Sequence, residues 1–426
     1  MRNKNVNSVL KEALEKIKPS AEELIEISPY VSKFIEEIKK EIGKNKVNAE
    51  VFLGGSFAKG TVVKKDVYDA DIFLRFDKKE KDISQLTEKI LRKILQPEKI
   101  HGSRDYFRIK KRGDFYIEVI PVLKIKNPRE AENITDLSYS HVNYIKRKIK
   151  SKMLDEVLLA KAFCYANKCY GAESYIRGFS GYALELLILH YKSFLKFAKA
   201  VEKIHEDKKE VIDIEKHFRN RREILMDLNS AKLQSPIILV DPTYKQRNVL
   251  AALSKETFEE FKKSCREFLR NPSVKLFEHK EIDFDKEKLN ARKKKLDFAV
   301  LKITTNKQEG DIAGSKLLKF YNHLGKEISK FFGIKKNGFE YKEGKNAMCF
   351  FSVKRKKEII LQGPMTKQEK NVEEFRKVHK NTFVKSGRIY AREKINFNLG
   401  EFLKKWKKRD ARRMKEMSVK DINLVN

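Results

Sequence analysis

Two aspartates are the first residues of this chain whose type and spacing could do chemistry. Asp69 and Asp71 lie in the predicted strand 68–76. Because side chains alternate along a strand, both carboxylates project from the same face. Adjacent carboxylates repel unless a cation lies between them, and Mg²⁺ prefers such oxygen ligands. The spacing predicts a metal site, although a lone Asp-x-Asp is more often a pair of solvated residues.

A glycine-rich turn precedes these acids. Residues 54–61 are Gly-Gly-Ser-Phe-Ala-Lys-Gly-Thr, and they follow a short apolar strand predicted over 49–53. We expect a turn at the glycines and a short helix from Ser56, whose backbone N–H groups can bind phosphate oxygens. A Gly-Gly-Ser by itself is more often an ordinary turn. Turn and acids together favour a site where a nucleotide's phosphates meet a divalent metal.

Glu118 is the third candidate acid. It is the only acid in the apolar and aromatic run 115–121, which is predicted to be a strand. Burial of an unpaired charge is costly, so this carboxylate needs a cation beside it. We interpret Glu118 as a further metal ligand. An ordinary ion pair with an arginine or lysine is the alternative that we favour less.

The surrounding elements indicate an α+β protein of several domains. Amphipathic helices predicted over 8–44 and 83–95 are expected to cover the sheet that carries the acids. We predict a catalytic domain over 1–135, a mostly helical central domain over 136–271, and a mixed α/β region with a basic tail over 272–426. Asn271-Pro272-Ser273 supplies the second boundary.

Two features of the central region point to anion binding. Lys161 falls on the apolar stripe of the helix predicted over 153–165, so its ammonium must either reach solvent or meet an anion. Ser180 is a predicted N-cap for one long helix over 182–200. Farther along, the sequence around Arg247 is predicted to lead into another helix, and Asn337-Gly338 to form a turn.

Composition favours a polyanionic partner. The 426 residues include 95 Lys and Arg against 60 Asp and Glu, a formal net charge of +35 that is spread along the chain. This predicts RNA or DNA binding, with a generally basic surface as the alternative. The basic segment 402–413, which contains Trp406, could contact an RNA backbone, or it could be a solvated helix. With no signal peptide and no membrane-length apolar run, the cytoplasm is expected.

The four cysteines give little support to a metal site. Cys164 and Cys169 are close in sequence, but no second Cys/His pair completes a zinc site. Cys164 lies in a helical apolar pattern, so we predict a buried free thiol there. Zinc binding through this pair is a distant alternative.

Several motifs, taken in order, resemble the archaeal-type (class I) CCA-adding enzymes, which are tRNA nucleotidyltransferases of the polymerase-beta-like superfamily. The resemblance covers nearly the whole chain and is sharpest over 54–270. It rests on Gly55-Ser56 through Asp69-x-Asp71, Ile117-Glu118-Val119, Asp136-x-Ser138-x-x-His141, Tyr170-Gly171-Ala172-Glu173, Arg177-Gly178-Phe179-Ser180-Gly181-Tyr182, Asp241-Pro242…Arg247-Asn248-Val249 and, more loosely, Gly363-Pro364 and Gly387-Arg388-Ile389-Tyr390-Ala391.

The resemblance implies a polymerase-beta-like fold and template-independent addition of CCA to the 3′ end of tRNA from CTP and ATP, with two Mg²⁺ ions. Asp69 and Asp71 would hold the nucleotide's metal and, with Glu118, a second metal beside the RNA 3′ hydroxyl. Arg247, together with the RNA itself, would read the incoming base. The residues implied to contact the nucleotide's phosphates and sugar are Gly55, Ser56, Lys59, Ser138, His141, Lys161, Tyr170 and Ser180.

Two departures from the family pattern concern the metal site. The third acid is Glu118 where the family usually has an aspartate, and the link between Thr61 and Asp69 is slightly longer than usual. Other functions stay open at this point. The chain could be a poly(A) polymerase or an oligoadenylate synthetase, or a non-catalytic RNA-binding protein on the same scaffold. The sequence does not decide the oligomeric state, and a homodimer is among the options.

Overall fold

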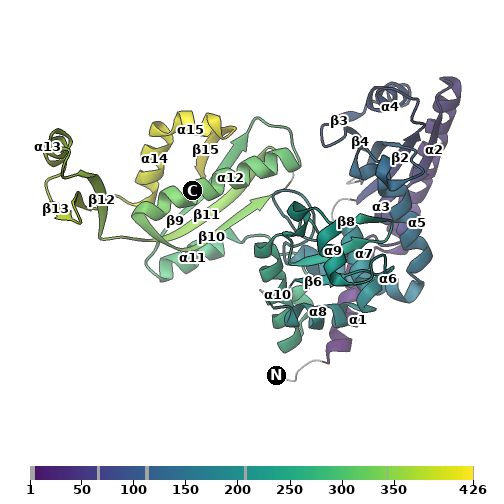
Figure 1. Cartoon of the computed structure of the whole chain (residues 1–426), viewed down its shortest axis with the longest axis horizontal. Coiled ribbons are helices and arrows are strands. Elements are labelled where there is room, and N and C mark those ends of the chain that lie inside the picture. The colour runs from purple at the N-terminus through teal and green to yellow at the C-terminus, as the bar shows by residue number, and fades with distance from the viewer. Residues whose placement is uncertain (1–4, 65–67, 111–114, 206–208, 343, 426) are drawn as a thin grey trace. The chain divides into compact units, whose positions relative to one another are not determined.

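The computed structural model divides the chain into two compact units, Met1–Lys280 and Glu281–Asn426 (Figure 1). The finer division into 1–135, 136–271 and 272–426 stays a prediction. No helix within the described residues is long and apolar enough to cross a membrane. The structure describes residues 5–64, 68–110, 115–205, 209–342 and 344–425.

A five-stranded sheet forms the first part of unit 1. Its order is β1 (Ala49–Leu53), β2 (Tyr68–Phe76), β5 (Phe115–Leu123), β4 (Tyr106–Lys110) and β3 (Glu98–Ile100). Only β2 and β5 are parallel neighbours in it. The predicted strands 49–53 and 68–76 are confirmed, and the expected short helix is α3 (Gly55–Lys59).

Period-two burial gives this sheet two different faces. Ala70, Ile72 and Leu74 of β2 pack in one core with helices α2 (Ala21–Lys44) and α4 (Ile83–Leu91). The residues that alternate with them along β2, including Asp69 and Asp71, lie on the opposite face. Helix cover on one side therefore directs the acids to the other side.

The first helix packs differently from our expectation. We expected the helices within 8–44 to cover the acid-bearing sheet, but α1 (Val6–Ile17) contributes Val9 and Ala13 to the core of the central helices. Helix α2 does pack on the sheet, and Ser20 and Glu23 form a capping box at its start. The chain thus begins by packing against a region that follows much later in sequence.

The central part of unit 1 is mostly helical, as predicted. A large core joins its helices through aromatic contacts, for example Phe163 with Phe194, Phe261 and Phe268. Its elements are η1 (Pro128–Glu130), η2 (Ile134–Leu137), α5 (Ser138–Lys148), α6 (Ser151–Ala166), α7 (Gly181–Tyr191), α8 (Phe194–Lys203), β6 (Glu210–Ile212), α9 (Arg221–Asp227), η3 (Ser230–Leu233), β7 (Ile237–Asp241), β8 (Tyr244–Asn248), α10 (Lys255–Arg270) and η4 (Val274–Leu276).

Two central predictions are wrong in detail. The helix predicted over 182–200 is broken, because Lys192 adopts a left-handed conformation with φ 71° and Ser193 accepts the Lys196 N–H to start α8. The segment around Arg247 is strand β8, which pairs with β7, and the next helix begins only at Lys255.

Unit 2 contains two antiparallel sheets. The larger has the order β10 (Phe332–Tyr341), β11 (Asn346–Arg355), β9 (Asp297–Thr305), β15 (Val419–Val425). The smaller has the order β12 (Glu358–Met365), β14 (Arg388–Lys394), β13 (Thr382–Lys385). The helices of this unit are α11 (Phe284–Lys293), α12 (Asp311–Phe331), α13 (Glu369–Val378), α14 (Leu399–Arg409) and α15 (Ala411–Glu416).

Two expectations for unit 2 need correction. Asn337-Gly338 forms no turn, because both residues lie inside β10. Gly338 pairs with Phe350, and a side chain there would collide with the phenylalanine ring, so the glycine makes room in the sheet. Trp406 is only 1% exposed and packs against Phe320. The tryptophan therefore belongs to the core and is not a surface for RNA.

Candidate active site

The three predicted acids come together on one face of the five-stranded sheet. In the parallel pairing of β2 with β5, Asp71 lies opposite Glu118, and Asp69 lies opposite Tyr116. Asp69, Asp71 and Glu118 are all partly exposed. Residues 69 and 71 share a face by strand alternation, and the register adds residue 118 to it. The structure thus places the three acids on one face of the sheet, and their grouping around metal ions stays a prediction.

Glu118 also has a cationic neighbour. Antiparallel pairing places Arg108 of β4 opposite Glu118, and the Arg108 Nε donates to Glu118 Oε1 at 2.9 Å. The ion pair that we favoured less is therefore present. This partner was not foreseen, because it comes from a strand that the chain pattern did not align with residue 118. A role of Glu118 in metal binding stays a prediction.

The fit to a divalent ion is clearest for the aspartates. Their carboxylate oxygens are the donors that Mg²⁺ prefers. Gly55 has φ 58°, and a side chain there would overlap the Asp71 carboxylate. Because residue 55 has no side chain, the Asp71 carboxylate has room beside the turn. Within the described ranges, no three His, Cys, Asp or Glu side chains are already grouped to hold a metal. Arg108 contacts Glu118 Oε1 through both its Nε and its Nη2.

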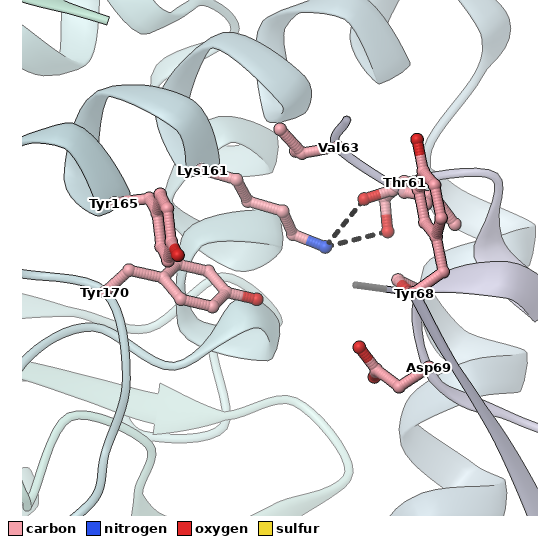
Figure 2. Close-up of a pocket in the computed structure, with 9 residues that line it drawn as sticks. Thr61, Val63, Tyr68, Asp69, Lys161, Tyr165 and Tyr170 are labelled. Atoms are coloured by element: carbon pink, nitrogen blue, oxygen red, sulfur yellow. Dashed lines mark hydrogen bonds between the residues drawn. The ribbon is translucent and has the colours of Figure 1, made fainter. Parts of the chain in front are cut away.

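A pocket beside the acids is lined from both parts of unit 1. Figure 2 shows Lys161 of α6 extending toward Thr61, with Tyr170 on one side of the pocket and Asp69 on the other. The Lys161 Nζ donates to Thr61 Oγ1 at 2.8 Å. Ser56 also lines this pocket. Four residues predicted to contact metal or nucleotide, Ser56, Asp69, Lys161 and Tyr170, therefore share one cavity.

Glu185 links this pocket to Lys59 of the glycine-rich segment 54–61, and sequence reasoning missed it. Its carboxylate is 0% exposed and accepts from Lys161 at 2.9 Å on Oε1 and from Lys59 at 2.7 Å on Oε2. Burial alone raises the pKa of Glu185, but the two ammonium charges outweigh burial and hold that pKa below its ordinary value. Lys161 is 4% exposed, so it meets an anion and does not reach solvent.

A second network surrounds Asp241. His141 Nε2 lies 3.0 Å from Asp241 Oδ2, and Arg247 Nη1 donates to the same oxygen at 2.7 Å. The His141 ring stacks on Tyr182 with centroids 4.1 Å apart. Burial lowers the pKa of His141 despite the nearby carboxylate. Burial alone raises the pKa of Asp241, but the bond from His141 and the charge of Arg247 hold it well below its ordinary range.

Ser138 and Ser180, which are also predicted to contact the nucleotide, lie at the starts of helices. Ser180 caps α7 by accepting the Ala183 N–H at 3.2 Å, which confirms the predicted N-cap. Gly181 follows it, and a side chain there would contact both the Tyr170 hydroxyl and Lys161. Ser138 is the first residue of α5, three positions before His141.

Two acids could have been found from the sequence. Glu185 is the only acid in the apolar helix α7, the same pattern that singled out Glu118. Asp241 stands in the motif that contains Arg247. The cysteines, by contrast, follow the prediction: Cys164 and Cys169 are buried free thiols, and burial raises the pKa of Cys169 to about 12.

Two family models match unit 1. The nucleotidyltransferase domain model matches residues 31–138, and the model of the second domain of tRNA nucleotidyltransferases matches residues 155–278. The acids fall in the first match, whereas Lys161, Glu185 and Asp241 fall in the second. The pocket lining therefore comes from both matched regions.

Curated relatives are archaeal CCA-adding enzymes. The enzyme of Nanoarchaeum equitans is 46% identical over 215 residues, which are 49% of this chain and 52% of the relative. That of Methanocaldococcus jannaschii is 29% identical over 399 residues, 91% of this chain and 87% of the relative. That of Pyrococcus abyssi is 34% identical, covering 63% of this chain and 60% of the relative. The alignments thus span about half to nearly nine tenths of these relatives.

Solved structures support the fold. A crystal structure of a mutant Cid1 poly(U) polymerase bound to MgATP matches with a TM-score of 0.51 at 15% identity. The match covers 65% of this chain and 100% of that chain. The nucleotidyltransferase fold that the sequence predicted is confirmed.

Proposed function

We propose that this chain is a member of the family of the archaeal CCA-adding enzymes, tRNA nucleotidyltransferases of the polymerase-beta-like superfamily, and that it adds CCA to the 3′ end of tRNA. Its archaeal relatives and the two matching family models support this proposal. The reaction uses CTP and ATP, needs no nucleic-acid template and releases pyrophosphate. The observation that carries the proposal is the placement of Asp69, Asp71 and Glu118 on one face of the sheet, with Asp69 lining the pocket that contains Lys161.

In the proposed reaction the 3′ hydroxyl of tRNA attacks the α-phosphorus of the nucleotide, and pyrophosphate leaves. Nucleotidyltransferases generally use divalent metal ions; the choice of Mg²⁺ and the number of two belong to this proposal. Asp69, Asp71 and Glu118 would hold these ions. When bound, the ions lower the pKa of the hydroxyl and neutralise charge on the leaving phosphates. Positioning and charge carry the rate, because the protein contributes little covalent chemistry.

The nucleotide's phosphates and sugar bind between the glycine-rich segment 54–61 and the central helices. Lys59 and Lys161 are supported for this role because Glu185 holds both ammonium groups beside the pocket. The other residues assigned to nucleotide binding are Gly55, Ser56, Ser138, His141, Tyr170 and Ser180. Lysine ammonium groups and serine hydroxyls suit phosphate oxygens, since both donate hydrogen bonds.

Arg247 selects the base in this proposal. Its Nη1 bonds to Asp241, and a guanidinium has five N–H donors, so others remain for acceptors on the Watson–Crick edge of C or A. G and U place donors at different positions on that edge, which opposes their binding. The order C, C, A arises as the growing RNA end reshapes the pocket.

The tRNA binds through the acceptor stem, mainly by shape, phosphate and 2′-hydroxyl contacts. A net charge of +35 supports binding to such a polyanion. The region 272–426 is assigned to tRNA binding, and the cytoplasm is the proposed compartment.

The deciding experiment supplies the full chain with tRNA lacking its last three nucleotides and resolves products to one nucleotide. CTP alone should extend the RNA by two nucleotides and stop, and CTP with ATP should complete three. A long run of A from ATP alone would favour a poly(A) polymerase, and short oligoadenylates formed without tRNA would favour an oligoadenylate synthetase. No incorporation with any triphosphate would favour a non-catalytic RNA-binding protein.

A further inference from the structure

Asp241 Oδ2 is a buried carboxylate oxygen with two partners. It contacts Arg247, which is assigned to base selection, and His141, which is assigned to the triphosphate and sugar. We propose that Asp241 is a positioning residue that sets base selection by fixing the Arg247 guanidinium. This inference rests on the proposed function, in which Arg247 reads the base. Asp241 itself is 0% exposed, so it acts through Arg247 and does not touch the nucleotide.

The two oxygens of Asp241 have separate partners. Oδ1 accepts from the Tyr182 hydroxyl at 3.1 Å and from the backbone N–H and hydroxyl of Thr243, both at 2.9 Å. Oδ2 faces His141 at 3.0 Å and Arg247 at 2.7 Å. The Oδ1 contacts anchor the carboxylate in the turn between β7 and β8, and this anchoring leaves Oδ2 at a fixed place.

That fixed oxygen restricts Arg247. A free arginine side chain samples many rotamers, and holding it in one of them costs conformational entropy. The Arg247 side chain is 21% exposed, and its Nη1 pairs with Asp241 Oδ2 at 2.7 Å. A donor that is already in place can distinguish the edge of cytosine from that of uracil, which is the same size. A mobile guanidinium could adapt to either base.

Asp241→Asn separates this role from the rest of the network. The asparagine carbonyl can still accept from Tyr182 and Thr243 in the place of Oδ1. Its amide then faces His141, which is able to accept through its other tautomer, and Arg247, which is not. Two donors oppose each other only at Arg247. Thr243→Val is the matched control, because it removes one of three hydrogen bonds to Oδ1, keeps the anchoring bonds from the Tyr182 hydroxyl and the residue 243 N–H, and leaves the Oδ2 contacts unchanged.

The test measures kcat/KM for CTP and UTP separately on tRNA lacking its last three nucleotides. We expect D241N to lower the CTP-to-UTP ratio by about 10- to 100-fold, the range for loss of a hydrogen bond to a charged group. T243V should keep the ratio of the unsubstituted chain. An unchanged ratio in D241N, or an equal fall in T243V, would overturn the proposal.

Two further variants keep the outcome decisive. Asp241→Glu retains the charge but moves it by one methylene, so it should also lower the ratio, and it carries the test if D241N does not fold. Arg247→Ala distinguishes a failure of base reading from a failure of CCA addition. If R247A keeps the ratio, base reading by Arg247 and positioning by Asp241 both fail, while CCA addition stands as long as trimmed tRNA is still completed.

Discussion

Asp71 lies directly opposite Glu118 across the parallel strands β2 and β5. This register has a strict consequence, because a slip of one residue would turn Glu118 to the helix-covered face of the sheet. Ile117 and Val119 already occupy that face in the core with α2. Burial of these apolar neighbours therefore holds the Glu118 side chain on the same side as the aspartates.

Asp71→Ala should abolish nucleotide incorporation and leave tRNA affinity almost unchanged. Loss of a charged group that stabilises a transition state costs about 10²–10³-fold in rate, and loss of a metal ligand should cost at least as much. Single-turnover incorporation and filter binding of tRNA measure the two effects. Asp77→Asn, just beyond the end of the same strand, is the control and should keep its activity. Substantial turnover in D71A would contradict the metal assignment.

Gly55→Ala should inactivate the protein through Asp71. The new methyl group would overlap the Asp71 carboxylate, and φ 58° adds strain of about 1 kcal/mol for a residue with a side chain. Gly60→Ala is a matched control: Gly60 has φ 67° at the other end of α3, but a side chain there meets only Leu154, at 3.8 Å. Both variants should lose the stability that left-handed backbone costs, G55A at least as much as G60A because of the overlap, and only G55A should lose incorporation. Equal activities would show that Asp71 tolerates displacement.

Local patterns predicted the catalytic sheet well. Strand 68–76 was found because apolar and polar residues alternate along it, and the same alternation placed Asp69 beside Asp71. The capping box at Ser20 and the N-cap at Ser180 are also local. These features depend on residues within a few positions of each other, which is the range that periodicity can detect.

Partners that are distant in sequence could not be predicted in this way. Lys161 was expected to meet an anion or solvent, but the pattern could not name Glu185, nor show that Lys59 shares it from 126 positions away. Arg108 is opposite Glu118 only because β4 pairs with β5. The break at Lys192 was missed for another reason, since left-handed backbone at a lysine leaves no mark in an apolar helical pattern.

The affinity for tRNA should fall steeply with added salt. Each phosphate contact releases counterions, so a chain with a net charge of +35 that makes several contacts should lose at least about 10²-fold in affinity between about 50 and 200 mM salt. Filter binding across a salt series measures the slope. Sucrose at matched osmolality is the control and should have little effect. If the affinity for tRNA does not change with salt, the basic charge does not serve tRNA binding.

Glu185→Gln should destabilise the protein at neutral pH, and this loss should fade in acid. Glutamine keeps the shape but removes the charge that neutralises Lys59 and Lys161, and breaking a buried ion pair from one side costs about 3–5 kcal/mol. Because the pKa of Glu185 in the folded chain is below the ordinary 4.5, its stabilisation is fully present above pH 4.5 and is lost as the pH falls through the lower folded value.

Urea unfolding from pH 7 to pH 3 should therefore show the free energies of unfolding of E185Q and of the unsubstituted chain converging below pH 4.5. Glu202→Gln, at a partly exposed pair with Arg266, should change stability by less than about 1 kcal/mol throughout. A gap between E185Q and the unsubstituted chain that stays constant to pH 3 would mean that Glu185 does not hold the two lysines through its charge.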